Sequence, residues 1–212
     1  MARPPADAPL LNPELIYTTA LRLIDQNGLE ALSMRKLAAE LDVTPRSLYH
    51  YVDTKDALLR EVYKVVLTEL ELPDFTDNWI SNLKEVARNF RKLCHKHQNV
   101  ATYFLGGHPP VERDTAVYEI LFSVLLKAGL PKAKLIAITR ALITFLVGYI
   151  LAELNGTFEL ERWRSRRVLA EKTPEHYPVF LQLPNPSESA EENFEIALEV
   201  LLGGLEELSA NK

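Results

Sequence analysis

Hydrogen-bond donors gather in one short stretch of this sequence, residues 44–55, between apolar positions. Arg46 carries a planar guanidinium that can donate two parallel hydrogen bonds, and Tyr49 and His50 follow it three and four residues later. Side chains at these spacings lie on the same face of a helix. A helix with such a face could donate hydrogen bonds to the base edges and phosphates of DNA.

Two short helices are expected to position these side chains. Ser33 and Thr44 have side-chain oxygens that can cap them, and Pro45 suits the first helical position, where its missing N–H costs nothing. Apolar residues at spacings of three and four face the other way: Leu37, Ala38, Leu41, Leu48 and Val52. The pattern predicts a helix-turn-helix over residues 32–59, with residues 45–51 as its second helix.

Longer helices are expected on both sides of this unit. Asn12 can cap a first helix, Pro13 fits its first position, and Asn27-Gly28 can end it. Thr54 can cap a helix that continues to about Glu69. Short capped helices with an outward Arg or Tyr also occur in all-α proteins that bind no nucleic acid, so the pattern alone leaves a merely solvated face as the alternative.

The spacing of these residues resembles the N-terminal signature of the TetR family of bacterial transcription repressors. The matching residues are Ala20, Leu23, Gly28, Ser33, Leu37, Ala38, Val43, Leu48, Tyr49, Tyr51, Val52, Lys55 and Leu58. A weaker similarity to the ligand-binding domain of the tetracycline-repressor branch rests on Trp79, Phe90-Arg91, Leu105-Gly106 and Asp114-Thr115. The resemblance implies a helix-turn-helix that binds DNA and a larger helical domain that binds a ligand.

A homodimer is expected, with one recognition segment in each of two successive major grooves of a pseudo-palindromic operator in double-stranded DNA. Arg46 is the residue expected to contact guanine, whereas Lys55 and Arg35 are expected at phosphates. The residues predicted to contact DNA are Ser33, Met34, Arg35, Thr44, Pro45, Arg46, Ser47, Tyr49, His50, Tyr51 and Lys55.

The predicted fold class is all-α, with an N-terminal three-helix helix-turn-helix DNA-binding domain over residues 10–56 and a larger helical effector-binding and dimerisation domain over residues 57–212. Residues 157–186, which include an arginine cluster, are expected to form a solvated loop. The resemblance implies that two long helices, residues 131–154 and 193–208, form the dimer interface, and ordinary packing within one subunit is the alternative explanation of their pattern.

Aromatic and apolar residues in the second domain favour a small hydrophobic effector, but any of them may instead be plain core. The predicted ligand contacts are Trp79, Val86, Phe90, Tyr103, Phe104, Ile120, Phe122 and Phe145. In a gap-free alignment from Trp79 onward, the resemblance puts Phe104 where tetracycline repressors carry a magnesium-binding histidine. Magnesium-tetracycline is therefore not expected as the inducer, and no metal or cofactor is predicted.

The composition limits the function further. The chain has 212 residues and a net charge of −5, which argues against indiscriminate coating of nucleic acid. Residues 31–60 carry five basic and four acidic side chains, so this segment is slightly basic on an acidic chain. The N-terminus lacks the apolar core of a signal peptide, and the longest apolar run, residues 141–152, is interpreted as too short to span a bilayer. A cytoplasmic protein with no membrane association is expected, and the single cysteine excludes an intrachain disulfide.

No catalytic pattern is present, because the sequence has no Gly-rich phosphate loop, no serine elbow motif and no paired-carboxylate motif. Cys94, His95 and His97 lie close together and are interpreted as a polar helix end rather than a metal site. The predicted function is a ligand-responsive repressor that a small hydrophobic effector releases from its operator. The alternative is an all-α enzyme or carrier that binds a small apolar molecule.

Overall fold

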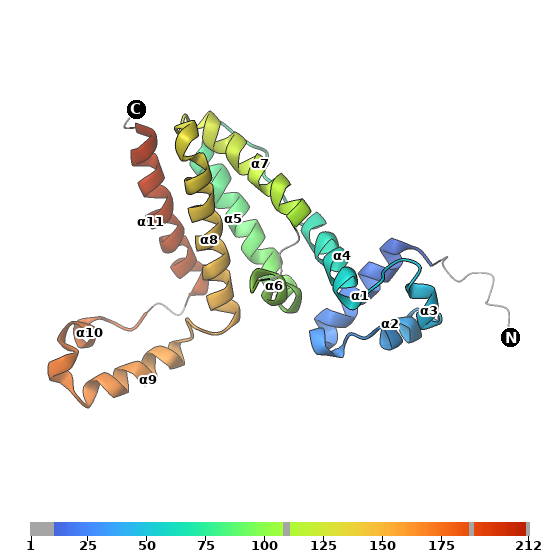
Figure 1. Ribbon diagram of the computed structural model, residues 1–212. Coiled ribbons are helices and arrows are strands. Elements are labelled where there is room, and N and C mark those ends of the chain that lie inside the picture. Colours follow the sequence, from blue (N-terminus) through green and yellow to red (C-terminus); the bar gives the residue numbers. More distant parts are fainter. Residues whose placement is uncertain (1–10, 108–110, 187–188, 211–212) are drawn as a thin grey trace. The chain divides into compact units, whose positions relative to one another are not determined.

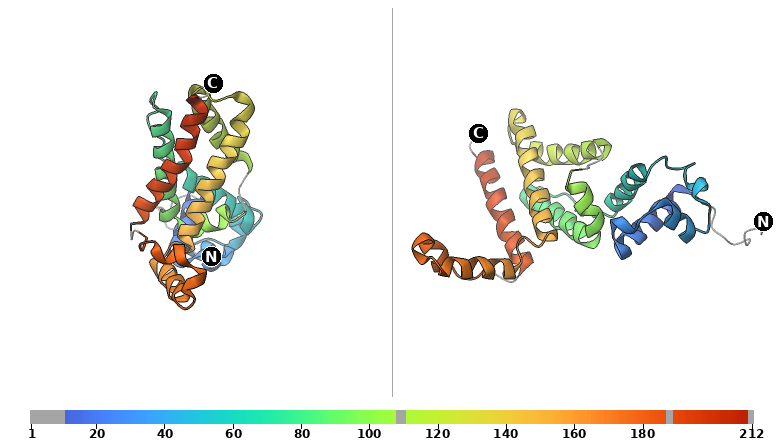
Figure 2. Two further views of the ribbon diagram at one scale, coloured as in Figure 1. Left: turned by 90° about the vertical axis from the view of Figure 1, so that its left-hand side faces the viewer. Right: turned by 60° about the horizontal axis from the view of Figure 1, so that its bottom comes forward.

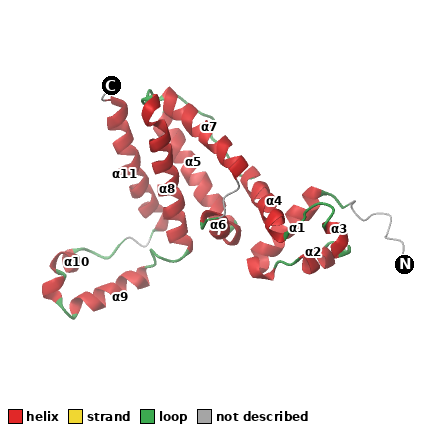
Figure 3. Ribbon diagram, in the orientation of Figure 1, coloured by secondary structure: helices red, strands yellow, loops and turns green. Residues whose placement is uncertain are grey.

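A computed structural model describes residues 11–107, 111–186 and 189–210, and within these residues all regular elements are helices (Figures 1 and 3). The all-α fold class is thereby confirmed. The α-helices are α1 Pro13–Asn27, α2 Met34–Glu40, α3 Pro45–Leu48, α4 Lys55–Thr68, α5 Trp79–Lys96, α6 Gln98–Leu105, α7 Val111–Lys127, α8 Leu135–Leu154, α9 Leu160–Glu171, α10 Pro178–Gln182 and α11 Ala190–Ala210. Residues 1–10, on which the expectation of no signal peptide rests, lie outside the described part.

The chain divides into two compact units by its internal contacts. Among the described residues, the first unit holds the chain up to Glu71 together with Asn89–Arg113, and the second holds Leu72–Arg88 together with the chain from Asp114 onward. Helix α5 therefore begins in the second unit and ends in the first. The predicted domain boundary after residue 56 stays a prediction.

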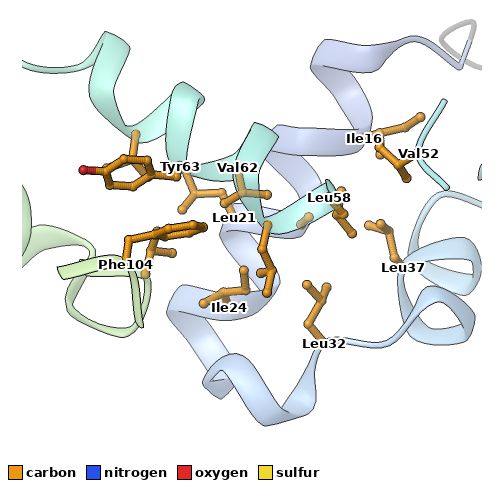
Figure 4. Close-up of a cluster of buried hydrophobic side chains, with 14 of the residues drawn as sticks. Ile16, Leu21, Ile24, Leu32, Leu37, Val52, Leu58, Val62, Tyr63 and Phe104 are labelled. Atoms are coloured by element: carbon orange, nitrogen blue, oxygen red, sulfur yellow. The ribbon is translucent and has the colours of Figure 1, made fainter. Parts of the chain in front are cut away.

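The first unit is built around one apolar core to which α1, α2, α3, α4 and α6 all contribute (Figure 4). The rings of Tyr63 on α4 and Phe104 on α6 stack with centroids 4.4 Å apart. The side chains that are fully buried or nearly so include Ile16, Ala20, Ile24, Leu32, Leu37, Leu48, Leu58, Val62 and Phe104. Burial of these groups is the main source of stability for such short helices, which would not persist alone in water.

The predicted helix caps are present in the first unit. Asn12 Oδ1 accepts the N–H of Leu15 at 2.8 Å, and Ser33 Oγ accepts that of Lys36 at 3.2 Å. Thr54 Oγ1 accepts the N–H of Ala57 at 3.0 Å at the start of α4. These caps define where three of the helices begin.

The helix that carries Arg46 is shorter than predicted. Helix α3 ends at Leu48, and residues 49–51 form a turn instead of continuing the helix. The carbonyl of Leu48 accepts the N–H groups of both Tyr51, at 2.9 Å, and Val52, at 3.1 Å. The chain has to turn here because Val52 is buried in the core and the next helix begins only three residues later.

Figure 2 shows the helices of the second unit from two further sides. Of these, α5, α7, α8 and α11 contribute to a second apolar cluster, whose buried members are Leu83, Leu121, Val124, Leu125, Leu130, Leu135, Ile138, Leu202 and Leu205. A third, smaller cluster contains Ala87, Phe194 and Leu198. Arg88 on α5 donates two hydrogen bonds of 2.6 Å to the carboxylate of Glu195 on α11. This bidentate pair fixes α11 against the middle of α5.

The prediction of a solvated loop over residues 157–186 is wrong, because α9 and α10 occupy most of it as a hairpin (Figure 1). Trp163 on α9 stacks on Phe180 on α10 with ring centroids 4.7 Å apart, and Arg167 Nη1 donates to the carbonyl of Leu183 at 2.9 Å. Residues 160–171 contain no Gly or Pro, so nothing in them breaks a helix. Helix α9 could not be recognised from the sequence, because polar residues lie on most of its sides and leave no apolar stripe.

Helix α8 is longer than the apolar run of residues 141–152. Residues Lys132–Leu154 are long and apolar enough to cross a membrane, by length and composition alone, and only 28% of the most apolar window is buried within the chain. The prediction that the apolar run is too short to span a bilayer is wrong, because the run follows Arg140 whereas the helix continues on both sides of that residue. Leu135 and Ile138 nevertheless belong to the second cluster, so α8 is in part a core helix of its unit.

Candidate nucleic-acid interface

Arg46, Tyr49 and His50 are exposed, as the predicted DNA-reading face requires. Tyr49 has 48% of its surface accessible, whereas its neighbour Leu48 is completely buried on the opposite side. The buried leucine holds α3 against the core of the first unit, so the exposed residues sit on a fixed support. Pro45 and Arg35 are exposed as well.

Several of the other predicted DNA contacts already take part in hydrogen bonds within the protein. Thr44 Oγ1 accepts the N–H of Ser47 at 3.3 Å and lies 2.9 Å from Ser47 Oγ, and Ser33 Oγ caps α2. A hydroxyl that accepts a backbone N–H keeps its own hydrogen, so Ser33 can cap a helix and still donate to a phosphate.

Tyr51 and Lys55 are held more firmly by the chain. The hydroxyl of Tyr51 donates to the carbonyl of Leu11 at 2.9 Å, and Lys55 Nζ donates to the carbonyl of Leu29 at 3.4 Å. The hydroxyl of Tyr51 has only one hydrogen, so it can donate to DNA only if it gives up Leu11. Met34 is half-buried against the core of the first unit. The roles of these residues at DNA stay predictions.

The predicted ligand contacts lie in different clusters. Trp79 and Phe122 both pack against the second cluster, and Phe145 packs against the third. Phe104 is 1% exposed in the core of the first unit, where Tyr103 packs beside it with ring centroids 4.9 Å apart. Val86, Phe90 and Ile120 are half-buried. The assignment of these residues to a ligand stays a prediction, and Phe104 also has a structural role that the sequence did not reveal.

The polar residues around the end of α5 are more than the solvated helix end that was expected. Cys94 is buried, and burial raises the pKa of its thiol to about 12, so it stays protonated and unreactive. His97 is 4% exposed and lies between two carboxylates, those of Asp25 and Glu69. Within the described ranges, no group of three or more His, Cys, Asp or Glu side chains is arranged to hold a metal ion. The contacts of His97 could not be predicted from the sequence, because its two partners are far away along the chain.

Comparison with known proteins gives concordant matches over most of the chain. Residues 16–62 match the family model described as bacterial regulatory proteins, tetR family, and residues 72–209 match the tetracyclin repressor-like, C-terminal domain. An HTH-type transcriptional regulator of Saccharopolyspora erythraea is 30% identical over 68% of this chain and 62% of its own length. The tetracycline repressor protein class E of Escherichia coli is 30% identical over 69% of this chain and 70% of its own length.

Solved structures agree with these relatives. The Streptomyces coelicolor protein ActR, crystallised in complex with actinorhodin, superposes with a TM-score of 0.79 at 29% identity, over 93% of this chain and 96% of ActR. The two chains thus share their fold over nearly the full length of each.

Proposed function

This chain belongs to the TetR family of bacterial regulatory proteins, and on that basis we propose that its dimer represses transcription from a pseudo-palindromic operator until a small effector releases it. Members of this family are ligand-binding transcriptional regulators rather than enzymes. The alternative of an all-α enzyme or carrier is therefore abandoned.

The observation that carries this proposal is the exposed face formed by Arg46, Tyr49 and His50 above the buried Leu48. One such face reads too few base pairs for useful specificity, so two copies have to act together on one operator. Arg46 is proposed to contact guanine, and Lys55 to contact a phosphate.

Apolar residues on α8 and α11 support the proposed dimer interface. Ile136 on α8 is 57% exposed, and Ile196 and Val200 on α11 are 54% and 77% exposed. A bundle of four such helices, two from each subunit, would remove these side chains from water. Proteins of this family are soluble regulators, and we propose that this one acts in the cytoplasm.

We propose that the effector contacts Trp79 and Phe122, because both are half-buried at the same apolar cluster of the second unit. ActR was crystallised with actinorhodin, which makes actinorhodin a suitable first probe. Binding would be followed by the fluorescence of Trp79 in a Trp163→Phe variant, since the chain has two tryptophans. A compound that changes this fluorescence should also release DNA, because a ligand shifts the equilibrium only by its difference in affinity between the two states.

Selection from a pool of random DNA duplexes tests the DNA-binding function. The purified protein should enrich an inverted repeat whose half-site centres lie one helical turn or a multiple of it apart, about 10 base pairs per turn. Failure to enrich any sequence, with the protein folded and dimeric, would overturn the proposed function.

A further inference from the structure

Tyr51 links the end of the helix-turn-helix to the start of α1. Its hydroxyl donates to the carbonyl of Leu11 at 2.9 Å, across 40 positions of the chain. The main-chain N–H of Tyr51 donates to the carbonyl of Leu48, the last residue of α3, also at 2.9 Å. Tyr51 is therefore attached to α3 through its main chain and to α1 through its side chain. The exposed residues Tyr49 and His50 lie in the turn between these two attachments.

The carbonyl of Leu11 is available to Tyr51 because of the way in which α1 begins. The main-chain N–H of Ile16 donates to the carbonyl of Asn12, the residue after Leu11. The N–H of Leu15, four residues after Leu11, donates instead to the side chain of Asn12 at 2.8 Å. The side chain of Leu11 packs against the core of the first unit. Tyr51 therefore bonds to an acceptor that the core holds in place.

A second link joins α1 to the chain on the other side of α3. Arg22 Nη2 on α1 lies 2.6 Å from Oε1 of Glu40, the last residue of α2. Residues 40–51, which include α3, are thus bonded to α1 at both ends. The side chains of this ion pair are 49% and 42% exposed, so salt screens their attraction. The hydrogen bond of Tyr51 joins two uncharged groups and is the link that salt leaves intact.

The hydroxyl of Tyr51 cannot serve both the protein and a phosphate. A phosphate oxygen only accepts hydrogen bonds, and the one hydrogen of this hydroxyl is already given to Leu11. The sequence-based prediction that Tyr51 contacts DNA would require the bond to Leu11 to break.

We propose that Tyr51 is a positioning residue, whose hydroxyl holds the turn of residues 49–51 against the start of α1 so that Tyr49 and His50 are arranged before DNA binds. The proposal rests on the proposed DNA-binding function. A turn without this bond adopts more conformations, and the binding-competent one is populated less. DNA then has to order the turn, which lowers the affinity.

The test compares the dimeric wild-type protein with Tyr51→Phe, which removes only the hydroxyl. Fluorescence anisotropy would measure the affinity for the duplex that the wild-type protein selects from a random pool, and for a duplex of random sequence. Tyr51→Phe should bind the selected duplex roughly tenfold more weakly, because one uncharged hydrogen bond is lost in each subunit. Binding to random DNA depends on phosphate contacts and should change by less than about twofold. A direct phosphate contact would be lost from both duplexes alike, and an equal loss for the two would overturn the proposal.

Hydrogen exchange of the free protein gives a second measurement, without DNA. The N–H groups of Tyr51 and Val52 both donate to the carbonyl of Leu48, so their exchange reports on the turn. Mass spectrometry of the peptides that contain residues 51 and 52 should show faster exchange in Tyr51→Phe than in the wild type. Unchanged exchange would show that the hydroxyl does not hold the turn. Faster exchange with an unchanged operator affinity would limit the bond to a structural role, and either result would contradict the proposal.

Leu11→Gly tests whether the donor and the acceptor act together. This change removes the side chain that holds the acceptor against the core, so it should also weaken operator binding. Tyr51→Phe should then have a smaller effect in Leu11→Gly than in the wild type, because the bond is already weakened. Additive losses of affinity would mean that the two residues act independently, contrary to the proposal.

Tyr177→Phe is the matched control, because Tyr177 is an exposed tyrosine of the second unit. It should keep the wild-type affinity and the wild-type exchange at residues 51 and 52. Circular dichroism would establish that each variant is folded, and Tyr51→Phe decides the question if Leu11→Gly does not fold. Failure of the wild-type protein to select any DNA would instead overturn the proposed function, so the two failures can be told apart.

Discussion

At the scale of single residues, Arg46 is the side chain on which sequence-specific binding should depend most. It is exposed on α3, and its guanidinium can donate to two acceptors of one guanine. Arg46→Ala should weaken operator binding by about 1 to 3 kcal/mol and relax the base preference at one position of each half-site. Lys55→Ala should weaken binding to all sequences alike. Repeating the duplex selection with both variants would measure the difference, and an unchanged base preference in Arg46→Ala would rule out this role.

Glu69 gives a second prediction at this scale, concerning acid. Hydrogen bonds from Lys96, and then from His97, hold the pKa of the Glu69 carboxyl below its ordinary value against the opposing effect of burial. A carboxyl with a lowered pKa in the folded state stabilises the protein above its unfolded-state pKa and loses that contribution as the pH falls through the folded-state pKa. Glu69→Gln should therefore lower the free energy of unfolding at pH 7 and have much less effect at about pH 3.

Urea denaturation at both pH values would measure this difference. Glu71→Gln is the matched control, because Glu71 is an exposed glutamate two positions further on. An equal loss of stability at the two pH values in Glu69→Gln would contradict the assignment of these hydrogen bonds.

At the scale of elements, the α9–α10 hairpin depends on the contact between Trp163 and Phe180. Stacked aromatic rings contribute about 0.5 to 1.5 kcal/mol beyond the area they bury, so Trp163→Ala should make local opening of the hairpin roughly fivefold more frequent. Trypsin should then cut faster at the arginines of α9, which mass spectrometry can follow. Val168→Ala, at a 57% exposed position on the same helix, should leave the cleavage rate unchanged. Equal rates in the two variants would show that the stack does not hold the hairpin.

The elements that the sequence predicted well are those with end signals and an apolar stripe. Helices α1, α2 and α4 begin at the expected caps, and α1 ends before Gly28, whose φ of +82° few other residues would adopt. Helix α9 has no apolar stripe and was missed. The end of α3 was misplaced because the burial of Val52, a tertiary effect, decides where the chain turns.

The candidate site was also predicted only in part. The exposed residues of α3 could be identified because they follow one another closely along the sequence. The contacts of His97 with Asp25 and Glu69 could not, because they join residues 72 and 28 positions apart. No local pattern signals such a pairing, and a single sequence contains no other information about it.

At the scale of the whole molecule, dimerisation should depend on the exposed apolar residues of α8 and α11. Val200 is 77% exposed on α11, and a symmetric interface would bury it twice. Val200→Asp should therefore weaken the dimer on the order of 100-fold or more, since burying each unpaired charge costs several kcal/mol. Leu72→Asp, at a 46% exposed position before α5, should leave the dimer intact. Sedimentation velocity at micromolar concentration would compare them, and a stable Val200→Asp dimer would exclude α11 from the interface.

Two copies of α3 are expected to bind one operator together from a dimer of fixed geometry. The most direct measurement inserts base pairs between the two half-sites of the selected duplex and determines the affinity of each spacing. An insertion of 5 base pairs turns one half-site by about half a turn of the helix, so one α3 would face the wrong side of the DNA. The affinity should then fall to nearly that for random DNA, a loss of about a thousandfold or more. An affinity that does not change with the spacing would contradict the claim.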